Sequence, residues 1–175
     1  MKKIMTVLSA LAIATSLSGC NIIIETAPEK SKTETAKPAM PKGDVKIYIP
    51  SDNGSGLIAR SLSIQYEDVN YVRILSEILA KDRASAHPIF PPMLSVRSVS
   101  VKDGIATVDF SKEILNLTSG TTTEELLISS MVDTLTEYPI ITGVVFTAEG
   151  KSIKKLSGHY DMTQIFKRNE ALIQK

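Results

Sequence analysis

The chain of 175 residues has one cysteine, no tryptophan and two histidines. A single thiol cannot form an internal disulfide, so the fold has to rest on side-chain packing. The two histidines, His87 and His159, stand far apart, and neither has a second ligand at helical spacing. We therefore expect no metal site and no cofactor. Aromatic residues make up only 5% of the chain, which counts mildly against a groove that binds glycans.

The chain also lacks a charge excess and the motifs of common catalytic sites. It has 20 basic and 19 acidic residues, and a nucleic-acid partner would need a basic stripe, so we expect none. There is no Gly-x-Ser-x-Gly elbow, and the glycines of residues 53–56 precede a strand rather than a helix. Asp109 and Glu113 are candidates for a glycan-cleaving pair in name only, because such pairs meet in space. We expect no enzyme.

A hydrophobic N-terminal run ends at the only cysteine. Lys2 and Lys3 precede an apolar stretch over residues 4–17, which is too short for a permanent membrane-spanning helix. Small residues then lead into Cys20. The pattern resembles a bacterial lipoprotein signal, which implies cleavage of residues 1–19 and lipid attachment to the Cys20 thiol. The alternative is an ordinary secretory signal, which would release a soluble protein.

Residues 20–43 are predicted to be the lipidated cysteine followed by a flexible tether. The segment is rich in Glu, Lys, Thr, Ala and Pro, and such a composition buries too little apolar surface to offset the entropy of ordering. A flexible coil of about twenty residues would hold a domain roughly 25 Å from its anchor. We therefore expect the domain at the extracytoplasmic face of a bacterial membrane, attached through the lipid on Cys20.

The folded domain is predicted over residues 44–175, which suffice for one ordinary domain. Residues 45–50 and 57–65 alternate between apolar and polar side chains, as strands do. Between them, residues 51–56 form a turn cluster.

A helix follows over residues 69–80, with Asp68 as its predicted cap. Apolar residues recur on one helical face; they are Tyr71, Leu75 and Ile78, with Val72 and Leu79 beside them. The connection over residues 81–92 is rich in proline, which excludes a regular central strand there.

The clearest local signal is a hairpin. Val96–Lys102 and Ile105–Phe110 flank Asp103-Gly104, a dipeptide that favours a two-residue turn. That turn predicts a register in which the apolar residues share one side of the sheet. The predicted cross-strand pairs are Val101 with Ala106 and Val99 with Val108.

A second helix is predicted to begin after Gly120, where Thr121 and Glu124 match a capping box, and to end at Pro139. Its apolar face comprises Leu127, Ile128, Met131, Leu135 and Tyr138. An apolar strand follows over residues 140–147. The order of strands and helices fits an α+β fold, a mixed β-sheet with two helices packed on one face.

Four short motifs in the second half carry a resemblance to a known family. They are Val108-Asp109-Phe110-Ser111, Thr134-Leu135-Thr136-Glu137-Tyr138-Pro139, Val144-Val145-Phe146 and Glu149-Gly150. In this order and spacing they resemble the GerMN domain of bacterial sporulation and spore-germination lipoproteins, over residues 45–173. The chain departs from that family at residues 81–83, where a glycine is usual, and it has room for one domain copy where the spore-germination members have two.

The resemblance implies a non-catalytic domain related to the ring-building domains of secretion systems, with envelope proteins or a second copy as partners. A sporulation or germination complex is the implied setting, and the sheet edge at residues 57–65 is an expected docking site. A module that binds peptidoglycan or another wall polymer is the second hypothesis. The motif residues are expected to be architectural; they are Asp109 and Ser111 at a turn, Thr134, Leu135 and Pro139 at the helix exit, and Gly150 in a tight turn.

Overall fold

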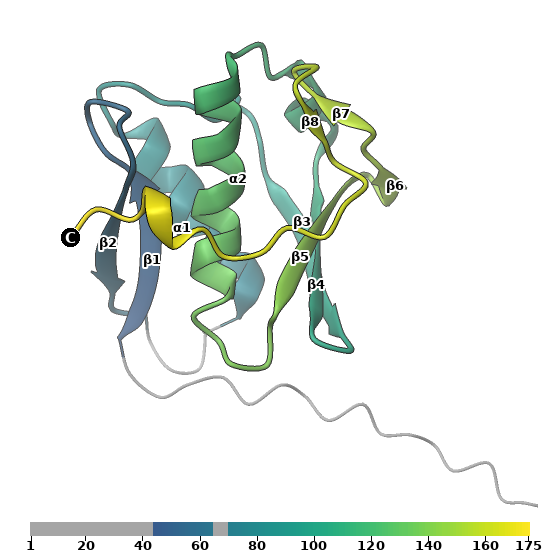
Figure 1. Ribbon diagram of the computed structural model, residues 1–175, viewed down its shortest axis with the longest axis horizontal. Helices are drawn as coiled ribbons and strands as arrows, with labels where there is room; N and C mark the ends of the chain where they lie inside the picture. The colour runs from purple at the N-terminus through teal and green to yellow at the C-terminus, as the bar shows by residue number, and fades with distance from the viewer. Residues whose placement is uncertain (1–43, 65–69) are drawn as a thin grey trace, which may run out of the picture. The chain divides into compact units, whose positions relative to one another are not determined.

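The computed structural model describes residues 44–64 and 70–175, all within one compact unit, Lys37–Lys175. Cys20, the predicted signal and tether, and Asp68 lie outside the described residues. The described elements follow the predicted order of two strands, helix, hairpin, helix and strand. Figure 1 shows the second helix in the middle of the view, with the first strand pair on the left and a larger sheet on the right.

The first two strands form a separate hairpin. Strand β1 (Val45–Pro50) pairs with β2 (Leu57–Leu62) in antiparallel register, and β2 is shorter than the predicted 57–65. The C-terminal tail covers the start of the β2 edge, because the Gln174 amide donates to the Leu57 carbonyl at 2.8 Å. The edge expected to dock a partner is therefore partly occupied by the chain itself.

The larger sheet is mixed, as predicted. Strands β3 (Val96–Lys102), β4 (Ile105–Phe110), β5 (Gly143–Ala148) and β6 (Lys151–Ser152) lie in that order, and the β4–β5 pair is parallel. The hairpin register is confirmed, and its turn has positive φ at both central residues, as Asp-Gly favours. The confirmed pairs are Val101 with Ala106 and Val99 with Val108.

Helix α1 (Tyr71–Arg83) begins later than predicted. Its N-cap is Asn70, whose side chain accepts a hydrogen bond from the Arg73 amide at 2.8 Å. The predicted apolar face is buried. Asp82, in the last turn, is also buried.

Helix α2 (Thr121–Leu135) corrects two predictions at its ends. Its N-cap is Gly120, and no side chain caps it, so the predicted capping box of Thr121 and Glu124 is wrong. Glu124 is fully buried and contacts His159 instead. The helix ends at Leu135, before Pro139, because Thr136 takes the C-cap position.

Strand β5 begins at Gly143 rather than at residue 140, because the chain first turns through residues 136–140. A side chain at Gly143 would not fit, since its Cβ would lie 2.5 Å from the Ile165 Cγ2 atom. The other edge of β5 pairs with Phe166 through a bridge at Val144. The tail thus pairs with one edge of β2, at Leu57, and with one edge of β5, at Val144.

The core lies between the helices and the two sheets. The β1–β2 hairpin and the four-stranded sheet share no strand pairing among the described residues, and both helices pack against each of them. The sheet side chains that face the helices are fully or almost fully buried. They are Ala106, Val108, Phe110, Val144 and Phe146, with Phe110 and Phe146 stacked at 5.8 Å between ring centroids.

Short elements complete the fold. They are η2 (Lys112–Asn116), β7 (Lys155–Leu156), β8 (Tyr160–Asp161) and η3 (Glu170–Leu172). In the tail, Leu172 and Ile173 cover a small cluster of Tyr48, Leu57 and Leu126. Ile165 remains half-exposed.

Candidate interaction groove

Asp109 is a structural anchor of the sheet. Its Oδ1 atom accepts hydrogen bonds from the Gly150 amide at 2.7 Å and the Thr147 hydroxyl at 2.8 Å, and its Oδ2 atom contacts the Arg97 guanidinium at 2.9 Å. Burial works to raise the pKa of Asp109, but these partners outweigh burial and hold it below its usual range. Gly150 has φ of +76° in the turn after β5, as predicted.

The carboxylates Asp109 and Glu113 show no sign of an acid–base pair. The Ser111 hydroxyl, the local backbone and Lys112 lower the pKa of Glu113, whereas a general acid needs a raised pKa. Ser111 is the N-cap of η2, but its side chain makes no capping bond and instead accepts from the Ser95 amide at 3.1 Å. Ser111 thus stands at a turn, and its side chain ties that turn to the residue before β3.

The exit of α2 is architectural. The Thr134 hydroxyl accepts a hydrogen bond from the Tyr48 amide of β1 at 3.0 Å, and Leu135 is fully buried. Tyr138 packs edge-to-face on Tyr71 at 5.1 Å, and burial raises the pKa of Tyr138 to about 12. Pro139 lies exposed in the turn that follows.

Arg168 ties the tail to this exit. Its Nη2 atom donates to the Tyr48 hydroxyl at 2.7 Å and contacts Glu137 Oε1 at 2.8 Å, and its Nη1 atom donates to the Asp133 carbonyl at 2.8 Å. The guanidinium also lies over the Tyr48 ring, 5.0 Å from its centroid. No local pattern predicts this network, because Tyr48, Asp133 and Glu137 are each more than 30 residues from Arg168 along the chain.

Glu124 and His159 connect the β7–β8 turn to the start of α2. The fully buried Glu124 carboxylate contacts His159 Nδ1 at 3.0 Å and accepts from the Tyr160 amide at 3.3 Å. In the same turn, the Ser157 hydroxyl donates to the Leu117 carbonyl at 2.9 Å. These contacts hold residues 117–124 on the side that faces the β7–β8 turn. The other side of this segment forms one wall of a groove.

Asp82 holds the opposite wall. Its two carboxylate oxygens accept hydrogen bonds from the amides of Ile89 at 2.9 Å and Phe90 at 3.1 Å. Burial raises the pKa of Asp82, and these amides oppose part of that rise. These contacts tie the proline-rich connection to the last turn of α1.

The two walls enclose an open groove of about 610 Å³. One wall is residues 87–93, with Pro88, Pro91 and Pro92, and the other runs from Glu113 through residues 116–120 to Thr123. A volume in this range is typical of ligand sites. Asp82 holds one wall and Glu124 with His159 holds the other, so we expect the groove to be formed before anything binds.

Exposed apolar side chains flank the groove. Among the described residues, the large hydrophobic side chains that stand exposed are Met93, Leu115, Ile140 and Ile165. Met93 lines the groove and is 79% exposed, and Leu115 precedes the lining residue Asn116. Exposed apolar surface beside a groove is typical of an interaction site.

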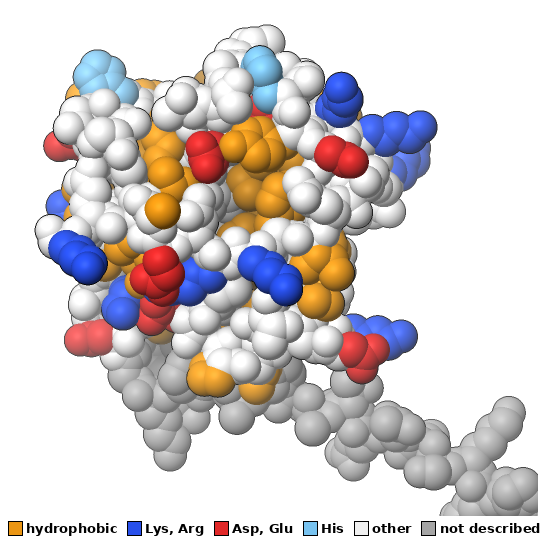
Figure 2. Space-filling view, in the orientation of Figure 1, with side chains coloured by type: hydrophobic (Ala, Val, Ile, Leu, Met, Phe, Trp, Pro, Cys, Tyr) orange, Lys and Arg blue, Asp and Glu red, His pale blue; other side chains and the backbone are white. Residues whose placement is uncertain are grey.

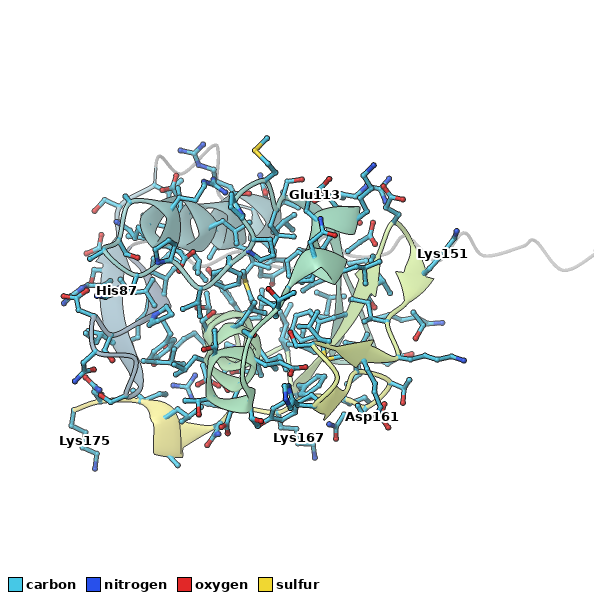
Figure 3. All side chains as sticks on the ribbon, turned by 90° about the horizontal axis from the view of Figure 1, so that it is seen from above. His87, Glu113, Lys151, Asp161, Lys167 and Lys175 are labelled. Carbon is cyan, nitrogen blue, oxygen red and sulfur yellow. The ribbon has the colours of Figure 1, made fainter. Side chains whose placement is uncertain are left out.

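The groove does not gather reactive groups. Its titratable lining residues, His87 and Glu113, lie well apart in Figure 3, one beside the β1–β2 hairpin and the other on η2. Within residues 44–64 and 70–175, no group of His, Cys, Asp and Glu could hold a metal ion. On the face that Figure 2 shows, basic and acidic side chains are interspersed. The geometry suits binding better than chemistry.

Comparisons with known proteins agree with this fold. The family model described as "Germane: Sporulation and spore germination" matches residues 46–154. The tandem GerMN domains of the sporulation protein GerM from Bacillus subtilis match with 20% identity and a TM-score of 0.57, covering 73% of this chain and 46% of that chain. The first GerMN domain of the same protein matches with 23% identity and a TM-score of 0.57, covering 73% of this chain and 98% of that one. The search of curated proteins finds no match.

Replacing Asp82 tests how the groove wall is held. D82A leaves the Ile89 and Phe90 amides without their acceptor, and we expect the free energy of unfolding to fall by about 2–4 kcal/mol. K81A, at the exposed neighbouring position, should change it by less than about 0.5 kcal/mol. Urea unfolding of both variants measures the difference, and equal losses would contradict the assigned role.

Replacing Asp109 tests the sheet anchor through pH. Because the pKa of folded Asp109 is lowered, its carboxylate stabilises the fold fully above the unfolded value of about 3.9, and that stabilisation is lost as pH falls further. D109N should be less stable than the parent near pH 7, by about 1–3 kcal/mol. The gap should narrow below about pH 4. Unfolding curves that stay parallel from pH 7 to pH 3 would show that the carboxylate is not anchored.

Proposed function

Since this chain belongs to the Germane family of sporulation and spore germination, we propose that its GerMN-like domain is a non-catalytic assembly module for an envelope protein complex. In this proposal the domain works at the extracytoplasmic face of a bacterial membrane, held there by a lipid on Cys20. The setting is a complex of sporulation or germination, as the family description suggests.

The groove is the observation that supports this proposal. Asp82 holds one wall, Glu124 and His159 brace the other, and Met93 stands exposed at the rim. A preformed groove loses little entropy when an occupant binds. The same walls bring no nucleophile next to a base, so the arrangement favours recognition over catalysis.

The lipid anchor rests on the sequence around Cys20. Within the described ranges, 44–64 and 70–175, there is no helix with the length and apolar character to cross a membrane. A lipid on Cys20 would supply the attachment, and stable anchoring takes two or more acyl chains. The domain would then meet its partners close to the membrane surface.

Crosslinking in intact cells tests the proposal. The full chain is captured after crosslinking, and attached molecules are identified by mass spectrometry. We expect one or a few envelope proteins, several-fold less abundant with M93S and retained with I165S, a matched change at another exposed apolar side chain. C20S should move the protein out of the membrane fraction.

Two results would contradict the proposal. Recovery of wall fragments without a protein partner would favour the polymer-binding alternative. A C20S protein that stays in the membrane fraction would remove the lipid anchor from the account.

A further inference from the structure

The groove has one acidic lining residue, Glu113. Hydrogen bonding to the Ser111 hydroxyl and to its local backbone lowers the pKa of Glu113. The described lining contains no lysine or arginine. An occupant with a cation near η2 would therefore meet a complementary charge, and an occupant with an anion there would be repelled.

The rest of the lining is mainly apolar and stiff. The wall of residues 87–93 contains three prolines together with Ile89, Phe90 and Met93. Across the groove, the lining is more polar, with Asn116, Thr118 and Thr123, and only 7% of Leu117 is exposed. The apolar wall and the Glu113 carboxylate thus face each other across the groove.

The position of the groove separates it from the start of the domain. In Figure 1 β1 begins at the lower end of the domain, whereas the groove residues lie around the start of α2, at the upper end. The described start of the domain therefore lies away from the groove.

We propose that the groove binds an extended apolar segment of an envelope protein that carries a lysine or arginine, with the cation beside Glu113 and the apolar side chains against Pro92 and Met93. This inference rests on the proposed assembly function and names the chemistry of the partner. Apolar contact supplies most of the affinity, and the charge selects the partner and its direction in the groove.

Site-specific photocrosslinking in cells tests the inference on the full chain. A photoreactive amino acid replaces Met93, and the crosslinked segment is mapped by mass spectrometry. We expect a segment of one envelope protein in which apolar residues lie within about three positions of a lysine or arginine, as an extended peptide would place them. E113K should reduce this product at least fivefold, and E113Q should reduce it less.

A charge exchange separates recognition from damage to the fold. Changing the mapped basic residue of the partner to glutamate should restore the product with E113K and lower it with the parent chain. I165S, which alters an exposed side chain packed at Gly143, should leave the product unchanged.

The outcomes distinguish this inference from the proposed function. A protein product that is insensitive to E113K, that lacks a basic residue or that maps to a second copy of this chain would overturn the inference while leaving an assembly role. Absence of a product from position 93, with a protein partner still captured by crosslinking of the unaltered chain in intact cells, would likewise overturn it alone. Wall fragments as the only product of both experiments would overturn both.

Discussion

Helix α2 has to join two sheets that share no strand pairing with each other in the described part of the chain. The Thr134 hydroxyl of α2 accepts a hydrogen bond from the Tyr48 amide of β1. The apolar face of α2 covers the inner side of β4 and β5. A buried amide without an acceptor would cost about 1–3 kcal/mol, so this one contact fixes where the hairpin sits. The contact ties β1 to the C-terminal end of α2, where Arg168 of the tail also binds Tyr48.

The polar residues of α2 show how a buried helix connects distant segments. Glu124 reaches the β7–β8 turn, Asp133 accepts the Asn169 amide at 2.9 Å, and Thr134 reaches β1. These three buried polar groups are directed to three different segments, which is why so much of the helix is buried while its charges remain partnered. Asp133 is the partial exception, because its Oδ2 atom has no partner and burial raises its pKa.

Local patterns predicted the parts of the fold that local forces determine. The Asp103-Gly104 turn and the alternation around it determine the hairpin and its register, so both were predictable. The capping box failed because burial of Glu124 against His159 outweighed local capping, and no local pattern reports that contact. The late start of β5 follows from the turn through residues 136–140, which the apolar run from residue 140 does not reveal.

The groove was not predicted as a site, although one signal pointed to it. Sequence patterns assigned architectural roles to Asp109, Thr134 and Gly150, and the contacts of these residues agree with those roles. The groove depends instead on Asp82, whose partners lie seven and eight residues ahead in a proline-rich segment. In the sequence, Asp82 stands out only as one of the residues 81–83, where the family usually has a glycine. Its hydrogen-bond partners, the Ile89 and Phe90 amides, can be identified only from the folded structure.

The central claim is that the groove is formed before any partner binds, and amide hydrogen exchange of the full chain tests it most directly. The Ile89 and Phe90 amides donate hydrogen bonds to the Asp82 carboxylate. The account predicts that they exchange almost as slowly as core amides of β4. The neighbouring amide of His87 serves as the comparison within the same connection. Exchange of Ile89 and Phe90 at the rate of an open loop would contradict the account, because the wall would then form only when a partner binds.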